Sequence, residues 1–361
     1  MLDSTHRNRR LLPHRPVHLT LFIPDLLPSR GLVSEPEIDG AAPALRRIFS
    51  HGSIESFPAV EAEAWLCQAF EVERRADWPV AALTAAVDGY ATENGWWLRA
   101  DPLHLQLHRS GSRTIAAPAL TLEAAEATAL IEALNTHFAG TGITFLARDP
   151  ARWYVRQDQS VDLTAPLLSS VAGRQLPQAI LSGTASSHWH RILTEAQMVM
   201  HDHPVNSNRE SRGLPSINSV LFWGGGLKPA VPGRHFTDIW TDDVLATALA
   251  VHSGADCTAA PASLALWSGS RPDPQGQHLI TLNRMHHSTR YSGPEAWLKT
   301  MGLLDESWFA PLWALLGGPL QELVVVATGA EHCLRCTLRP KDRLKFWRRT
   351  PNWTGLLPQD P

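Results

Sequence analysis

Several features are scarce in this sequence, and each scarcity narrows the class of protein. No apolar run approaches the roughly 18 consecutive residues that a membrane-spanning helix requires, so we do not expect the protein to associate with a membrane. The basic start MLDSTHRNRRLLPHRP has no apolar stretch of the kind found in secretory signals, which favours a cytoplasmic protein. With only four cysteines in 361 residues, no disulfide framework is expected in a chain of this size.

Charge is also sparse. Charged residues make up 19% of the chain and the formal net charge is −3, so no general attraction to nucleic acid is expected. Lysine is nearly missing, because only four of the 32 basic residues are lysines. The remaining arginines carry planar guanidinium groups, which suit two-point contacts with anions. Apolar residues make up 44%, as in soluble globular proteins, and the length predicts two domains or one large α/β unit with an insertion.

Predicted strands and helices alternate along the chain. Val17–Ile23 is a β-branched, apolar run that predicts a first strand, and it places Asp25 at the carboxyl end, where open α/β sheets bind ligands. Asp25 is therefore either a functional carboxylate or an ordinary solvated turn residue. Helices are predicted at Ala41–Ser50, Pro58–Phe70, Ala81–Tyr90, Thr121–Phe138 (with Thr121 as its N-cap), Ser187–His201, Asp238–His252 and Pro294–Leu316. Further strands are predicted at Trp96–Arg109, Ile143–Ala147, Trp153–Arg156, Ile217–Trp223, Leu279–Leu282 and Leu323–Thr328.

The stretch from His201 to Pro229 is the most specific part of the sequence. A helical pattern ends at Pro204, because a proline ring inside a helix removes a hydrogen bond and causes a clash. A polar segment rich in turn residues follows, and then the apolar strand that ends in Gly224–Gly226. Three glycines after a strand predict either a close approach of backbone to another group or a positive φ angle. A simple tight turn at a sheet edge is the alternative.

The same stretch follows the pattern HPVN-x-x-R-x-x-x-G and then a-N-x-I-W-x-W-G-x-G-x-x-P. It matches in order and spacing at His203, Pro204, Val205, Asn206, Arg209, Gly213, Asn218, Trp223, Gly224, Gly226 and Pro229. This pattern resembles the archaeal-type cofactor-independent phosphoglycerate mutases of the alkaline-phosphatase superfamily, and most of all their RpfE-type regulatory branch. The family also has a strand with Arg-x-Asn and a helix ending Leu-Ile-Glu-x-Leu-Asn. Here Arg99 takes the arginine position, Asp101 replaces the asparagine, and the helix ends LIEALN.

The resemblance implies a fold and a division of the chain. The implied fold is α/β, with an alkaline-phosphatase-like three-layer α/β/α core and a smaller inserted α+β domain. Residues 1–91 and 186–350 would form the core, residues 92–185 the inserted domain, and residues 351–361 a C-terminal tail.

The positions that carry catalysis in the family differ here. Asp25 matches a metal-binding carboxylate, but Leu26 stands where the family has glycine. Aligned by length, Val60 and Glu61 stand in the positions of the nucleophilic serine and its following aspartate, and Ser53 or Ser56 is a possible substitute. The metal-binding Asp-x-x-x-His pair becomes His287 and Tyr291, and the later Asp-His pair becomes Glu331 and His332.

Two hypotheses follow. The first is a non-catalytic, regulatory relative that binds a small phosphorylated or carboxylate ligand, or a regulatory protein, between the two domains and needs no cofactor. Its expected ligand-binding residues are Arg99, His203, Asn206, Arg209, Asn218, Trp223, Gly224, Gly225 and Gly226. The second is an active phosphoglycerate mutase or phosphatase in which Mn or Mg is held by ligands drawn from Asp25, His201, Asp202, His203, Glu331 and His332.

Two features near the carboxyl end remain open. Cys333 and Cys336 form a single C-x-x-C, and if this segment is a strand their side chains point to opposite faces, which disfavours zinc or redox chemistry. The basic segment from Arg335 to Arg349 is either an edge strand kept from aggregation by its charges or a docking surface for an acidic partner.

Overall fold

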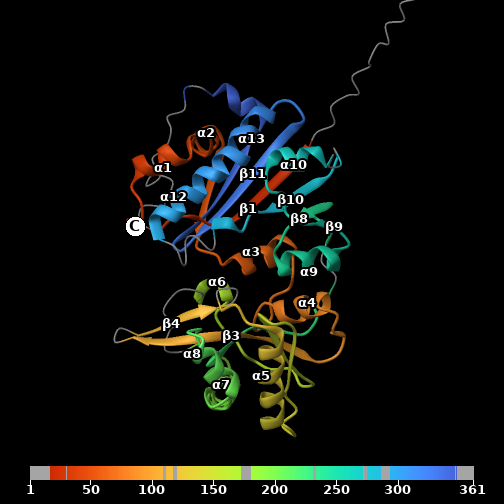
Figure 1. Ribbon diagram of the computed structural model, residues 1–361. Helices are drawn as coiled ribbons and strands as arrows, with labels where there is room; N and C mark the ends of the chain where they lie inside the picture. Colours follow the sequence, from red (N-terminus) through yellow and green to blue (C-terminus); the bar gives the residue numbers. More distant parts are fainter. Residues whose placement is uncertain are drawn as a thin grey trace, which may run out of the picture.

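The computed structural model describes residues 17–29, 31–108, 111–116, 120–171, 180–230, 233–270, 273, 275–285, 293–345 and 347. The chain forms two β-sheets, which lie one above the other in Figure 1. No described helix is both long enough and apolar enough to cross a bilayer.

The larger sheet has seven strands in the order β2-β12-β11-β1-β10-β8-β9. Its centre is parallel, because β1 pairs in parallel with both β10 and β11, and β10 with β8. On one side the antiparallel strands β12 and β2 complete it, so the sheet is mixed. The strands are β1 (Val17–Leu27), β2 (Ser53–Pro58), β8 (Asp238–Trp240), β9 (Asp256–Thr258), β10 (Gln277–Thr281), β11 (Leu320–Gly329) and β12 (His332–Leu338).

Both faces of this sheet are buried, as parallel strands require. Along β11, Val324 and Val326 join the apolar core on one face, while Leu323 and Val325 join the core on the other. The second of these faces is covered by α1 (Glu35–Ala41), α2 (Pro43–His51), α10 (Leu264–Gly269), α12 (Gly293–Leu304), the π-helical turn Asp305–Phe309 and α13 (Ala310–Leu315). Helices α3 (Ala62–Ala69) and α9 (Val244–Ser253) lie on the first face, between the two sheets (Figure 1). The expected α/β fold with a layered core is confirmed.

The smaller sheet has five strands and is antiparallel throughout. It consists of β3 (Trp96–His108), β4 (Gly111–Ala116), β5 (Thr144–Asp149), β6 (Arg152–Gln157) and β7 (Ser219–Gly226). The associated helices are α4 (Val80–Val87), α5 (Ala124–His137), α6 (Leu168–Val171), α7 (Ser186–His201) and α8 (Pro204–Ser211). Helix α6 lies on the side of β3 that faces the larger sheet, whereas α7 and α8 lie on the far side (Figure 1).

The pairing of β7 differs from the expected division of the chain. Residues 186–350 were expected in the core, but β7 pairs with β3 from Trp97 to Leu103, and α7 packs against β7. The segment 186–226 therefore lies with the smaller sheet, and the chain rejoins the larger sheet at β8. The resemblance implied that β7 belongs to the core, and no local sequence pattern reveals that β3 has an open edge for it.

Three local predictions also need correction. Helix α7 ends at His201, as expected, but the segment from Pro204 that was predicted as turns forms helix α8, since proline is well tolerated in the first turn and His203 supplies the N-cap. The segment predicted as a helix from Asp238 starts with strand β8, and α9 begins only after the N-cap Asp243. Helix α5 is capped by Glu123 in a capping box with Glu126, not by Thr121. The tail 351–361 lies outside the described residues.

Candidate ligand pocket

A small pocket of about 80 Å³ lies at the carboxyl ends of β1 and β11, where α/β sheets commonly bind ligands. That volume holds several water molecules or one small chemical group. The larger sheet contributes Asp25 and Thr328, the segment leading into α3 contributes Val60 and Glu61, and α6 contributes Ser169 and Ser170. The pocket therefore lies between the two halves of the chain.

Asp25 is held in this pocket by an unusual backbone conformation. Its φ angle is 56°, a left-handed value that a residue with a side chain adopts only at some cost, and its side chain is buried. Strand pairing between β1 and β11 is irregular from Ile23 to Leu27, and the Asp25 N–H donates to Thr328 Oγ1 at 3.2 Å. Such irregularities redirect side chains at the end of a strand. Asp25 is therefore a buried residue of the pocket and not a solvated turn aspartate.

The segment before α3 brings Val60 to the pocket in the expected nucleophile position. Val60 is half-buried against the apolar core, and Glu61 is the N-cap residue of α3. The possible substitutes Ser53 and Ser56 lie on β2, paired with Thr337 and Leu334. Neither serine lines this pocket.

Sequence reasoning missed the serines of α6. Ser169 donates both its N–H, at 2.9 Å, and its hydroxyl to the carboxylate of Glu63 on α3. The Ser170 hydroxyl donates to the Leu167 carbonyl at 2.7 Å. The two contacts of Ser169 with Glu63 join α6 of the smaller half to α3 of the larger half. Nothing in the local sequence signals them, because the partners are about a hundred positions apart.

The expected metal ligands do not gather at the pocket. Asp25 lines it, whereas Glu331 lies exposed in the turn after β11 and His332 is the first residue of β12. His201, Asp202 and His203 lie at the junction of α7 and α8, on the far side of the smaller sheet. Within the described part of the chain, no three His, Cys, Asp or Glu side chains are placed to hold a metal ion. His287 and Tyr291 lie outside the described residues.

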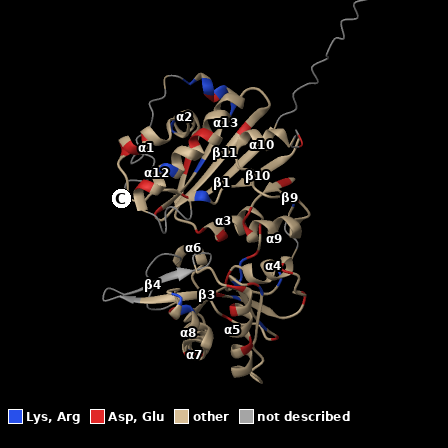
Figure 2. Cartoon of the chain, viewed as in Figure 1, with Lys and Arg blue, Asp and Glu red and all other residues tan. Residues whose placement is uncertain are grey.

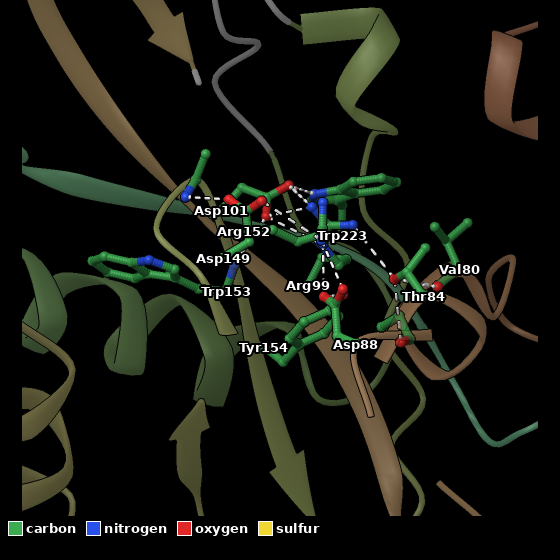
Figure 3. Close-up of polar contacts among 12 residues, drawn as sticks. Val80, Thr84, Asp88, Arg99, Asp101, Asp149, Arg152, Trp153, Tyr154 and Trp223 are labelled. Atoms are coloured by element: carbon green, nitrogen blue, oxygen red, sulfur yellow. Dashed lines mark hydrogen bonds and ion pairs between the residues drawn. The ribbon is translucent and has the colours of Figure 1, made fainter. Parts of the chain in front are cut away.

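Arg99, an expected anion contact, is engaged inside the smaller half (Figure 3). Its Nη2 donates to both carboxylate oxygens of Asp101, at 2.7 and 2.8 Å, and its Nε to Oδ1 at 3.1 Å. Trp223 Nε1 donates to the same carboxylate at 2.8 Å, and the guanidinium lies over the Trp223 and Tyr154 rings at 4.9 and 5.3 Å. Both charged side chains are buried, so an external anion could reach Arg99 only by displacing Asp101.

A second ion pair lies beside the first. Arg152 donates to the two oxygens of Asp88 at 2.7 Å each, and the Tyr154 hydroxyl donates to Asp88 at 2.6 Å (Figure 3). Burial alone would raise the pKa of Asp88, but the hydrogen bonds from Arg152 and Tyr154 outweigh it and hold the pKa below the ordinary value. Burial raises the pKa of Tyr154 itself. This cluster stabilises β3, β6 and α4 against one another.

The motif residues Asn206 and Arg209 also make internal contacts. Asn206 Nδ2 donates to the carbonyls of Met200 and Ile217 at 2.6 and 2.8 Å, and its Oδ1 accepts from the Ile217 N–H at 2.7 Å. Arg209 is fully buried and donates to Glu126 at 2.6 Å and to the carbonyls of Pro215 and Leu120 at 2.8 and 2.7 Å. These side chains fix α8 to α7, α5 and the approach to β7, which is a structural role.

The other motif residues shape β7. The Asn218 side chain accepts from the Leu105 N–H at 2.7 Å and donates to the Leu105 carbonyl at 3.1 Å, which extends the pairing of β7 with β3. A Cβ at Gly225 would lie 2.5 Å from the Trp96 ring, and one at Gly226 would lie 2.7 Å from Pro79. Gly224 has a φ angle of 64°. The predicted close approach and positive φ are thus confirmed, and both serve packing.

Gly225 and Gly226 also border a second pocket of about 80 Å³, together with Asp77, Trp96 and Lys228. Burial raises the pKa of Asp77, although hydrogen bonds from the Trp78 and Ala165 backbone partly offset this. The charged residues that border this pocket are thus Asp77, Glu73, Arg75 and Lys228, of which only Asp77 is buried. Lys228 is paired with Glu93 at 2.9 Å.

The C-x-x-C lies on strand β12, as one reading predicted. Cys333 joins the core on one face of the sheet and Cys336 the core on the other. Burial raises the pKa of the Cys333 thiol to about 11, so it is protonated at neutral pH. The two thiols therefore cannot bind one metal ion together or form a disulfide with each other.

No protein-family model matches this chain, and no curated protein sequence matches it either. Among solved structures, the chain is similar to the PH0037 protein from Pyrococcus horikoshii, with a TM-score of 0.51 and 14% identity over 90% of this chain and 88% of that chain. It is also similar to a cofactor-independent phosphoglycerate mutase from Thermoplasma acidophilum DSM 1728, with a TM-score of 0.46 and 15% identity over 89% of each chain. Likeness at such low identity extends to the fold and no further.

Proposed function

We propose that this chain is a non-catalytic relative of the phosphoglycerate mutases, with a regulatory binding role like that implied by its resemblance to RpfE-type proteins. One observation carries the proposal. Val60 lines the pocket beside Asp25, in the position that the resemblance assigns to the nucleophile, and valine has no group that can accept a phosphoryl group. The proposed role requires no cofactor.

The charged residues that line the pocket determine which kind of ligand it can bind. Its acidic lining residues are Asp25 and Glu61, and no described lining residue is a lysine or arginine. The arginines expected to bind an anion, Arg99 and Arg209, are paired with Asp101 and Glu126 elsewhere. A phosphate or carboxylate would meet like charge here. We therefore place a regulatory protein, contributing a hydrogen-bond donor to the pocket, ahead of the small anion expected from the sequence.

The test is an assay of the purified full-length chain for conversion of 3-phosphoglycerate to 2-phosphoglycerate, with Mn²⁺ or Mg²⁺ added. We expect no turnover above the protein-free blank, and no gain in the Val60→Ser variant, because the rest of the ligand set is incomplete within the described residues. An active mutase run in parallel validates the assay. Turnover by the wild-type chain that is lost in Asp25→Ala would refute the proposal.

One observation favours the alternative of an active metal-dependent mutase or phosphatase. Asp25 is retained in a costly backbone conformation, and three hydroxyl side chains, Ser169, Ser170 and Thr328, line the same pocket. The described residues do not assemble a three-ligand metal site, so we derive no step through a metal. Metal analysis of the purified chain and a phosphatase assay on p-nitrophenyl phosphate separate the two roles, since only the alternative predicts bound Mn or Mg together with turnover.

A further inference from the structure

Trp313 on α13 contacts two arginine side chains from distant parts of the chain. Arg47 on α2 and Arg343 on the short helix η2 (Pro340–Leu344) each place the guanidinium carbon 5.5 Å from the centre of the Trp313 ring. The His51 ring meets the indole edge-on at 4.9 Å between centroids. Cation–π contacts of this kind hold guanidinium groups in place without neutralising their charge.

We define the basic-aromatic surface as Arg47, Trp313, Lys341, Arg343 and the neighbouring Leu344. Within the described part of the chain, Arg47 and Arg343 form no ion pair with a carboxylate, whereas Lys341 is attracted to the neighbouring Asp342. The neighbouring Arg46 and Arg339, by contrast, pair with Asp39 and Glu322. Arg343 instead donates from Nη1 to the Leu316 carbonyl, which fixes its position.

Positive charge is therefore concentrated here, although the chain as a whole carries a formal charge of −3. Figure 2 shows blue Lys and Arg segments at the end of the molecule that contains α2 and α13. Ordered cations on an otherwise acidic molecule orient an approaching acidic partner toward one face. Because these arginines are already held in place, binding immobilises them at little further entropic cost.

The same surface also has an apolar component. Leu344 is 71% exposed and Trp347, just beyond η2, is 67% exposed. Arginine and tryptophan are the residues most enriched where protein partners bind tightly. A partner that fits must thus supply carboxylates together with at least one apolar side chain.

We propose that the basic-aromatic surface binds an acidic segment of a partner protein, whose carboxylates pair with Arg47 and Arg343 while an apolar side chain covers Leu344. The surface lies over the helices on the face of the larger sheet opposite the Asp25 pocket, so this proposal is independent of the proposed function. An extended nucleic acid is disfavoured because the molecule's net charge would repel it.

The test uses a fluorescein-labelled peptide of glutamates interrupted by leucines, with binding to the full-length chain followed by fluorescence anisotropy. We expect the wild-type chain to bind the peptide and the affinity to fall as salt is raised, since screening weakens exposed ion pairs. In the double variant Arg47→Glu, Arg343→Glu the affinity should fall by at least about tenfold. The single variant Arg47→Glu keeps the Arg343 contact to Leu316 and should lose only part of the affinity for the peptide.

Arg74→Glu is the matched control, because Arg74 is also an exposed arginine that lies over a tryptophan, 5.6 Å from the Trp78 ring. It should bind the peptide like the wild-type chain. Absence of peptide binding, or an equal loss in Arg74→Glu and Arg47→Glu, would overturn the proposal. The proposal would also be overturned if the wild-type chain bound a single-stranded oligonucleotide or phosphatidylserine vesicles more tightly than the peptide, and if the double variant lost that binding.

Discussion

Asp101 determines what Arg99 can do. In the resembled family an asparagine stands at this position, and a neutral amide would leave a cationic arginine available to an anion. The aspartate instead pairs with Arg99 through three hydrogen bonds and also accepts from Trp223. Arg99 thus forms an internal ion pair where the resemblance implied an anion contact.

The first prediction concerns this pair. Asp101→Asn leaves the buried Arg99 guanidinium without its compensating charge, and we expect the free energy of unfolding to fall by about 3–5 kcal/mol. Denaturant titration measures the change. Asp158→Asn is the control, because it removes the partner of Arg156 in a pair whose side chains are 39% and 86% exposed, and exposed pairs contribute little. Equal effects of the two substitutions would contradict the assigned role.

The second prediction concerns His278, which is buried beside Trp240 and Trp267. Burial lowers its pKa, although the Asp273 carbonyl, at 2.7 Å, and the Asp238 carboxylate, at 3.2 Å, partly oppose this. The folded chain therefore favours neutral His278, and the unfolded chain binds the proton more readily. The contribution of His278 to the free energy of unfolding is fully present above about pH 6.5. It declines as the pH falls below that value, by up to about 1.4 kcal/mol per pH unit.

Denaturant titrations measure this dependence of stability on pH. They are run at a series of pH values between the ordinary pKa values of carboxylates and of histidine. His278→Gln should flatten this dependence, because this substitution removes the buried imidazole. If the slope survived in His278→Gln, another group would be its source.

At the scale of elements, the three glycines of β7 set how closely it packs. Gly225 lies where any side chain would meet the buried Trp96 ring, and Gly226 lies against Pro79 at the start of α4. The glycines allow β7, β3 and α4 to pack as one unit. The glycine run, which the first hypothesis counted among the ligand-binding residues, thus packs against Trp96 and Pro79.

The third prediction follows from that packing. Gly225→Ala forces its Cβ to within 2.5 Å of Trp96 Cζ2, and we expect a loss of about 1–3 kcal/mol in the free energy of unfolding. Thermal or denaturant unfolding measures it. Gly269→Ala in α10 is the control, because no atom lies within 4 Å of a Cβ built there, and it should be neutral or slightly stabilising. A neutral Gly225→Ala would show that the Trp96 contact is easily relieved.

At the scale of the whole molecule, the two halves share one apolar core. That core includes Phe22 and Val326 of the larger sheet together with Leu98 and Phe222 of the smaller one. Helix α4 is apolar and almost wholly buried, and it packs against α9 of the larger half as well as β3 and β7 of the smaller half. A shared core of this kind couples the stability of its parts.

The fourth prediction is therefore a single cooperative unfolding transition for the full-length chain, with equal calorimetric and van't Hoff enthalpies. Leu83→Ala on α4 removes buried apolar contacts and should shift that one transition, with a loss of about 2–5 kcal/mol. Two resolved transitions in the wild-type chain, only one of which moves in Leu83→Ala, would mean that the halves unfold independently.

Local patterns in the sequence determined most of the elements and the fold class. Apolar runs and alternation depend on neighbouring residues alone, so β1, β3, β7 and β11 could be predicted without knowing their partners. The glycine run also predicted a close backbone approach for the same reason. The resemblance carried by the stretch from His203 to Pro229 indicated the α/β fold.

Only the tertiary structure decided the use of the individual side chains. Arg209 meets Glu126, Ser169 meets Glu63, and Arg47 meets Trp313 across large separations in the chain. A charged or polar side chain is chemically the same whether it faces a ligand or an internal partner. Its role is set by which groups the fold brings within hydrogen-bonding distance, and that depends on contacts no local pattern contains.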